Sequence, residues 1–359
     1  MTIKQKLQAL ATEKNTPCVT ISLNTNRTYP ENAQDVIQLK NLLKEAEERV
    51  IKEFGKRPAA SLLEKLSGIE NEIDVNYNLD SLHIYLSNDT KEIIKSTWAI
   101  KENGVHISDS FDIRSLINSY SRSEEYFILL LSQGGVKLYN AISDGIVNEF
   151  RNEDFPFSEN QHYNTHADKG SDSKHLDDLV REYFNKVDKA LVKISNETGL
   201  NCVVICTEDN YSRLMQVADK PTIYLGHANV DYNNIDTEHL AKQGWEVVKS
   251  LQDKQRAEAI SEMKGAVGQG TILTDLQEIY QASIDGRADL LMVHQDFAQP
   301  VLMKGTRTFE LATDTSNSAV VDDITSNIAW NVLSKNGRVF FTKQDEIKDL
   351  GKIVLKTRY

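Results

Sequence analysis

The chain has 359 residues, of which 40% are hydrophobic, and its formal net charge is -12. This length predicts two or three domains. The acidic balance argues against a free-standing nucleic-acid binder, because such proteins gain affinity by neutralising phosphates, but it leaves open docking on a ribonucleoprotein through local basic patches. No run approaches the roughly 18 apolar residues that indicate a membrane span, and the first residues lack the apolar core of a signal peptide, so we expect no membrane partner.

Residues 1–122 are predicted to form an N-terminal α/β domain. Apolar residues recur at helical spacing between Leu39 and Val50 and again between Leu62 and Ile73, with charges on the opposite faces. In chain order we expect a helix over 1–16, a strand over 18–23, a polar connector over 24–32, a helix ending near Phe54, a helix over 58–75, strands over 82–87 and 104–111, and a short helix over 112–120.

The stretch 126–150 predicts three strands joined by two tight turns. The first strand is continuously apolar, as is typical of a strand buried on both faces. Gly134-Gly135 and Asp144-Gly145 supply the turns, because glycine readily takes the positive φ values that hairpin turns require. Strands that are adjacent in the chain are therefore expected to pair in antiparallel fashion.

A polar segment without periodicity, residues 153–174, follows this meander. A loop of that length is uncommon in a compact domain and is usually functional or disordered. A long amphipathic helix over 173–198, a buried strand over 201–207, a helix over 209–217 and a strand over 222–225 complete a middle domain of residues 123–230. We interpret Cys202 and Cys206 in the buried strand as core thiols of a cytoplasmic protein, since reducing compartments disfavour disulfides.

Residues 231–359 are predicted to form the C-terminal domain. A charged helix runs to about Lys264, and Thr274 and Gln277 have capping-box spacing at the start of the next helix. We then expect a strand over 290–294, a strand over 300–304 beside it, a helix through 321–333, a strand over 338–341 and a strand at the C-terminus. Helices and strands intermixed in all three parts indicate the α/β class with mixed sheets.

The sequence contains no strong signature of an active site or a metal site. His162, His166 and His175 lie in or beside the polar loop, but no cysteine is near and the neighbouring acids show no zinc-ligand spacing. The glycines of residues 265–270 lack the Gly-Lys-Ser/Thr ending of a phosphate-binding loop, and no Gly-x-Ser-x-Gly elbow occurs. We therefore predict no catalytic residue, no metal ligand and no cofactor.

Four segments, taken in their order, carry a resemblance to a known family. They are residues 17–50, which begin PCVTISLNTNRTYP, the hairpins YFILLLSQGGVKLYNAISDG, and residues 268–297 and 322–347. Together they resemble bacterial members of the archaeal and eukaryotic class 1 release factor superfamily, close to bacterial archaeo-eukaryotic release factor family 3. The resemblance covers nearly the whole chain and implies three α/β domains, the third similar to ribosomal protein L7Ae.

The catalytic tripeptide of that family, Gly-Gly-Gln, is absent from this chain. In the family it lies on the middle-domain loop that enters the peptidyl transferase centre, where its glutamine positions a water on the peptidyl ester. The corresponding loop here, residues 153–174, lacks it, and Gln133-Gly134-Gly135 has the reverse order in a hairpin turn. The resemblance therefore implies a ribosome-associated, release-factor-like protein that occupies the A site in hibernation, stress or rescue rather than in peptide release.

This hypothesis assigns parts of the chain to parts of the ribosome. Asn26 and Arg27 in the connector are expected to face the decoding centre, and the third domain a translational GTPase such as elongation factor Tu. The loop residues expected to contact ribosomal RNA are Phe155, Phe157, Gln161, His162, Lys169 and Lys174. The alternative is a peptidyl-tRNA hydrolase or nuclease that uses Gln161 or His162, and a third interpretation is a stress-associated scaffold without ribosome contact.

Overall fold

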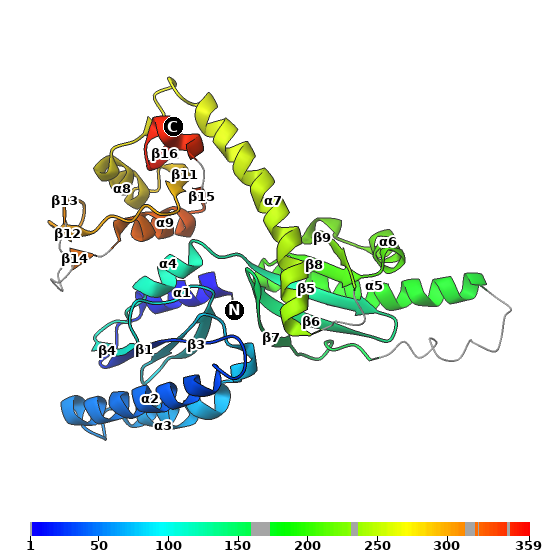
Figure 1. The fold of residues 1–359 in the computed structure, drawn as a ribbon, viewed down its shortest axis with the longest axis horizontal. Coiled ribbons are helices and arrows are strands. Elements are labelled where there is room, and N and C mark those ends of the chain that lie inside the picture. The colour runs from blue at the N-terminus through cyan, green and yellow to red at the C-terminus, as the bar shows by residue number, and fades with distance from the viewer. Residues whose placement is uncertain (1, 159–172, 231–235, 313–319, 322, 343–344) are drawn as a thin grey trace. The chain divides into compact units, whose positions relative to one another are not determined.

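The computed structural model describes residues 2–158, 173–230, 236–312, 320–321, 323–342 and 345–359 (Figure 1). The chain forms two compact units. The first comprises Met1–Phe111 and Ser123–Leu251, and the second comprises Asp112–Arg122 and Gln252–Tyr359. Both units mix helices with strands, so the predicted α/β class is confirmed. The division into three domains stays a prediction.

The first sheet of the first unit has four antiparallel strands in the order β3-β2-β1-β4. This part of the unit contains α1 (Ile3–Thr12), β1 (Cys18–Asn24), α2 (Ala33–Phe54), α3 (Ala60–Gly68), η1 (Ile69–Glu72), η2 (Val75–Tyr77), β2 (Ser81–Leu86), β3 (Lys91–Ser96) and β4 (Gly104–Ser108). Helices α2 and α3 cover one face of the sheet, because Leu39 and Leu62 of their apolar stripes pack in one core with Ile21 of β1.

Two elements of this region differ from the prediction. Strand β3 is not predicted from the sequence because its charged side chains resemble a loop, yet it pairs with β2 at the edge of the sheet, where charged residues are common. The single helix predicted over 58–75 ends at Gly68 and gives way to short 3₁₀ turns. Asp74 caps the second turn by accepting a hydrogen bond from the Asn76 backbone N–H at 3.0 Å.

The second sheet of the first unit has five strands in the order β7-β6-β5-β8-β9. Its elements are β5 (Glu125–Ser132), β6 (Gly135–Ile142), β7 (Gly145–Phe150), α5 (Ser173–Thr198), β8 (Cys202–Cys206), α6 (Glu208–Val217), η3 (Pro221–Ile223) and β9 (Tyr224–Asn229). Strands β5, β6 and β7 form the predicted antiparallel meander. Strand β8 runs parallel to β5, and β9 runs parallel to β8, so the predicted mixed sheet is confirmed.

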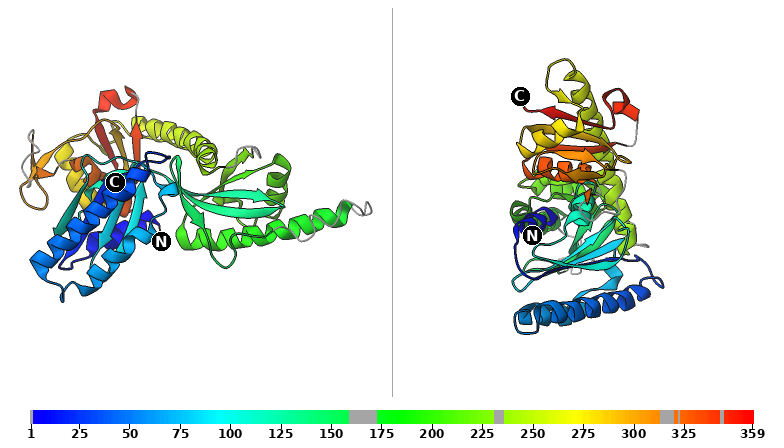
Figure 2. Two further views of the ribbon diagram at one scale, coloured as in Figure 1. Left: turned by 60° about the horizontal axis from the view of Figure 1, so that its bottom comes forward. Right: turned by 90° about the vertical axis from the view of Figure 1, so that its left-hand side faces the viewer.

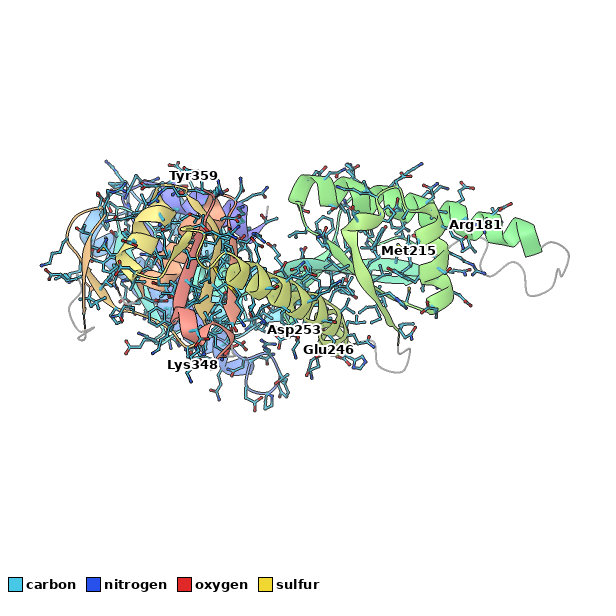
Figure 3. The ribbon with its side chains drawn as sticks, turned by 90° about the horizontal axis from the view of Figure 1, so that it is seen from above. Arg181, Met215, Glu246, Asp253, Lys348 and Tyr359 are labelled. Carbon is cyan, nitrogen blue, oxygen red and sulfur yellow. The ribbon has the colours of Figure 1, made fainter. Side chains whose placement is uncertain are left out.

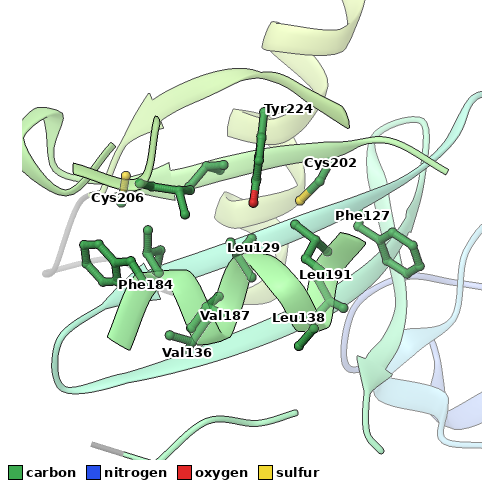
Figure 4. Packing of buried hydrophobic residues seen from close by; sticks show 14 of the residues in the cluster. Phe127, Leu129, Val136, Leu138, Phe184, Val187, Leu191, Cys202, Cys206 and Tyr224 are labelled. Atoms are coloured by element: carbon green, nitrogen blue, oxygen red, sulfur yellow. The ribbon is translucent and has the colours of Figure 1, made fainter. Parts of the chain in front are cut away.

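Strand β5 is buried on both faces, as its continuous apolar run predicts. Phe127 packs with α5 and α6 in one core (Figure 4), whereas Ile128 packs in another core with the first part of α7 (Thr237–Gly265). Figure 2 shows α5 running along one face of the sheet, and Figure 3 labels Arg181 on α5 and Met215 on α6. The alternation of side chains along β5 therefore requires a helical layer on each side of the sheet.

The three cysteines are buried and free, which agrees with the interpretation of Cys202 and Cys206 as core thiols. Burial raises the pKa of Cys18 to about 11 and that of Cys206 to about 12. Since the thiolate is the reactive form, these side chains act as small hydrophobic groups near neutral pH. No helix in the described residues is both long enough and apolar enough to cross a membrane.

The second unit contains a four-stranded sheet in the order β10-β16-β11-β15 and a three-stranded sheet in the order β13-β12-β14. Besides the end of α7, its elements are α4 (Arg114–Tyr120), β10 (Ile272–Leu273), α8 (Leu276–Ile284), β11 (Ala288–His294), β12 (Val301–Met303), β13 (Phe309–Leu311), β14 (Val320–Val321), α9 (Ile324–Ser334), β15 (Arg338–Thr342), η4 (Asp345–Leu350) and β16 (Ile353–Thr357). Ile279 of α8 and Ile328 of α9 share a core with Leu291 of β11.

Three features of the second unit differ from the prediction. The sequence assigns α4 to the first domain, but its Tyr120 ring packs edge-on against Trp330 of α9, with 6.1 Å between centroids. Strand β12 pairs with β13 and β14 instead of lying beside β11. The N-cap of α8 is Asp275 rather than Thr274, and its carboxylate accepts a hydrogen bond from the Glu278 backbone N–H at 3.0 Å.

An ion-pair network fastens the end of α7 to the four-stranded sheet of the second unit. Arg338 of β15 donates two hydrogen bonds to Glu262, at 2.9 and 2.8 Å. Lys356 of β16 donates to Glu262 at 2.9 Å and to Asp289 of β11 at 2.7 Å. The hydrogen bond from Arg338, followed by that from Lys356, lowers the pKa of Glu262 from 4.5 to about 2. The network therefore depends on an ionised Glu262.

We predict that Glu262→Gln destabilises the second unit at pH 6 but not at pH 2. The folded-state pKa of Glu262 is depressed, so its contribution is complete above pH 4.5 and is lost as the pH falls through about 2. Backbone amide hydrogen exchange in β15 and β16, compared at equal pH, should be faster in the variant only at the higher pH. Glu258→Gln, on an exposed part of the same helix, is the matched control. Equal differences at both pH values would contradict the assignment.

Candidate functional site

After β7, the first residues of the predicted loop, up to Ser158, run back along the second sheet. The Phe157 backbone N–H donates to the Val136 carbonyl at 2.9 Å, and the Val136 N–H donates to the Phe157 carbonyl at 3.1 Å. Between β7 and this bridge, Asn152 accepts hydrogen bonds from the backbone N–H groups of Asp154 and Phe155, at 3.0 and 2.7 Å. Such a side-chain-closed turn fixes the direction of the chain. Residues 152–158 are therefore ordered against the sheet.

A series of aromatic side chains holds this return in place. The Phe155 ring lies 5.1 Å from the Phe157 ring, which in turn lies 6.2 Å from Tyr183 of α5. Phe155 is 1% exposed and packs in the core that contains Phe184. The Tyr183 hydroxyl donates to the Ser158 carbonyl at 2.8 Å, and burial raises its pKa to about 12. We call Phe155, Phe157 and Tyr183 the aromatic anchor, because they fasten the start of the loop to α5.

The aromatic anchor changes the role of two residues that the sequence assigns to RNA contact. The Phe155 side chain is in the core and offers no surface to RNA, and Phe157 is half-buried against Tyr183. Their sequence pattern, two aromatics in a polar segment, is equally typical of anchors, and only the fold separates the two roles.

The remaining loop predictions fall on parts of the chain outside the described ranges. Gln161, His162 and Lys169 lie outside the described residues, as does His166. Lys174 lies in the first turn of α5, but its side chain, like that of His175, is outside the description. Across the described residues, no group of three or more histidine, cysteine or acidic side chains could hold a metal ion.

The connector residues are held by carboxylates. Asn26 donates to Asp35 through its backbone N–H at 2.8 Å and through its side-chain amide at 2.9 Å, and Asp35 is 2% exposed. Arg27 donates to both carboxylate oxygens of Asp80, at 2.8 and 2.7 Å, and its third nitrogen lies 3.0 Å from Asp144. The hydrogen bond to Asp80 raises the pKa of Arg27. Both predicted contact residues are therefore preordered by the protein.

Sequence reasoning missed the acidic partners of the connector. Asp80 precedes β2 and Asp144 lies in the turn between β6 and β7, so neither is near Arg27 in the chain. The Asp144-Gly145 pair is recognisable in the sequence, but only as a hairpin turn. Tyr29, next to these residues in the connector, is 82% exposed. The described residues thus include an anchored loop base and, separately, a connector whose arginine is half-exposed.

The sequence model of bacterial archaeo-eukaryotic release factor family 3 matches residues 125–287. This match confirms the family resemblance for these residues, and the resemblance of residues 17–50 and 322–347 stays a prediction. The match covers the second sheet of the first unit, the aromatic anchor and the start of the second unit. The family is named for release factors. The search of the curated proteins found no match to the chain.

Several solved structures are similar to the chain at a low level. An archaeal translation termination factor, aRF1, is 12% identical over 99% of this chain and 97% of its own, with a TM-score of 0.26. Pelota from Archaeoglobus fulgidus is 12% identical over 77% and 79%, with a TM-score of 0.32. Archaeal Pelota, described as ribosome-bound with ABCE1, is 13% identical over 99% and 94%, with a TM-score of 0.42. These superpositions are weak, and no functional assignment follows from them.

We predict that Phe155→Ala destabilises the first unit by about 3–5 kcal/mol, the usual cost of emptying a buried phenylalanine site. The expected measurement is a lower midpoint of denaturant unfolding, with faster hydrogen exchange of the Val136 and Phe157 amides. Glu153→Ala, an exposed neighbour, should leave both unchanged. If Phe155→Ala behaves like the control, the phenylalanine does not anchor the loop.

Proposed function

We propose that this protein is a ribosome-associated factor that occupies the A site during hibernation, stress or rescue without cleaving peptidyl-tRNA. One observation carries the proposal. The family match spans the segment that bears catalytic Gly-Gly-Gln in release factors, and in this chain that segment has no Gly-Gly-Gln. A release factor without its glutamine keeps the means of binding and lacks the group that positions the attacking water.

The anchored loop base supports a binding role. A segment that must meet a defined surface binds more tightly when its ends are fixed, because less conformational entropy is lost on binding. Here Phe157 is bonded to Val136 on one side, and α5 begins at Ser173 on the other. In the proposed complex, residues 159–172 reach toward the peptidyl transferase centre, and Lys169 and Lys174 supply cations near ribosomal RNA.

The same proposal assigns partners to the remaining parts of the chain. The connector with Asn26 and Arg27 faces the decoding centre, and the C-terminal part faces elongation factor Tu or another translational GTPase. The acidic net charge of -12 makes contacts with RNA dependent on a small number of local cations. Binding should therefore weaken with added salt, and the protein would act in the cytoplasm, where ribosomes are found.

We predict that the full chain co-sediments with ribosomes from starved cells. Replacing residues 159–172 with a Gly-Ser linker of equal length should lower the affinity for ribosomes by about tenfold or more, the equivalent of losing a few contacts. The linker leaves the aromatic anchor in place, so folding is preserved. Because residues 159–172 hold three acids and one lysine, Glu47→Gln with Glu48→Gln, on the exposed side of α2, is the control for the same change of net charge. Absence of the native chain from ribosomal fractions of both growing and starved cells would contradict the proposal.

The alternative hydrolase is tested separately, since Gln161 falls in the loop where the family carries its glutamine. We predict that the native protein and Gln161→Ala release peptide from peptidyl-tRNA on ribosomes equally, at the background rate. Removal of a side chain that hydrogen-bonds the reacting groups in the transition state, as the Gln161 amide would, costs about 100-fold or more. Release by the native protein that Gln161→Ala or His162→Ala abolishes would favour the hydrolase.

A further inference from the structure

Three segments of the first unit meet at Arg27. They are the connector, the turn before β2 that contains Leu79 and Asp80, and the turn between β6 and β7 that contains Asp144 and Gly145. We call this meeting point the Arg27 junction. The Thr25 hydroxyl donates to the Leu79 carbonyl at 2.8 Å, which ties the first two segments together independently of charge.

The third segment docks closely on the second. A Cβ placed on Gly145 would lie 2.3 Å from the Leu79 Cδ2 atom, so only glycine fits there without displacement. Ser143 is tied back to the sheet, because its N–H donates to the Glu124 carbonyl at 2.7 Å and its carbonyl accepts from the Tyr126 hydroxyl at 2.9 Å. The turn that carries Asp144 is therefore positioned by the Gly145–Leu79 contact on one side and by the hydrogen bonds of Ser143 on the other.

Asp80 and Asp144 make different numbers of hydrogen bonds to Arg27. Asp80 accepts two hydrogen bonds, from the Nε and Nη2 groups, whereas Asp144 accepts a single contact from Nη1. Asp144 is also the most exposed member, with 44% of its side chain accessible against 32% for Arg27. A bidentate ion pair is stronger than a single contact, so a competing anion would displace Asp144 from Arg27 more easily than Asp80.

We propose that the Arg27–Asp144 ion pair is a latch that a nucleic-acid phosphate opens. The phosphate takes the Nη1 donor from Asp144, while Asp80 keeps its two hydrogen bonds and holds the guanidinium in place. Arginine is well suited to this exchange, because its planar fork binds carboxylates and phosphates alike. The RNA source of the phosphate rests on the proposed function; the competition between the two anions does not.

The test uses the full chain and a single-stranded RNA oligonucleotide. Asp144→Asn removes the competing charge while keeping the shape of the side chain, and should raise affinity for the oligonucleotide by about two- to fivefold, as expected for a half-exposed ion pair. Asp219→Asn, which removes the same charge at an exposed position elsewhere in the first unit, should change the affinity less. In an Arg27→Gln background, Asp144→Asn should no longer raise the affinity.

Amide hydrogen exchange at Ser143 and Gly145 provides the second measurement. In the native protein, RNA should speed exchange at this turn, whereas Asp144→Asn should show the faster rate already without RNA. Equal affinity gains for Asp144→Asn and Asp219→Asn, or exchange rates that neither RNA nor the substitution changes, would overturn the latch. Opening by inorganic phosphate but not by RNA would overturn its assignment to nucleic acid. Loss of ribosome co-sedimentation alone would overturn only the proposed function.

Discussion

The burial of β5 on both faces is the constraint on which the rest of the first unit depends. A strand in the middle of a five-stranded sheet exposes alternate side chains to opposite sides, and both sets are apolar here. Helices must therefore cover both faces. Helix α5 covers one of them, and the chain must travel to it from β7 at the edge of the sheet. The polar segment of residues 153–174 makes this connection.

A connection of this kind can serve as a binding element only if its ends are fixed. Phe155 fills a core position, and Phe157 adds two backbone hydrogen bonds to β6, so the segment leaves the sheet at a defined place. The energy of the anchor comes from burial, which is independent of any ligand. In the proposed complex, this separation of roles leaves residues 159–172 for contact with the ribosome.

Local patterns in the sequence predicted much of the fold. The meander was predictable because the Asp144-Gly145 turn and the alternation of side chains are local signals, and the same holds for the stripes of α2 and α5. Strand β3 was not predictable, because its sequence lacks alternating apolar residues. Its position is decided by pairing with β2. The cap of α8 shifted by one residue because Thr274 and Asp275 are adjacent and both are good N-caps.

The candidate site was less predictable, because its contacts join distant residues. Arg27 was recognisable as a cation in the connector, but its carboxylate partners come from two turns elsewhere in the chain. Phe155 was recognisable as an aromatic, but only the fold shows that it is a core residue. The measurement that tests the account most directly is a cryo-EM map of ribosomes incubated with the purified protein. The account predicts density in the A site with residues 153–174 directed toward the peptidyl transferase centre; a protein bound elsewhere on the ribosome, or no bound protein, would contradict it.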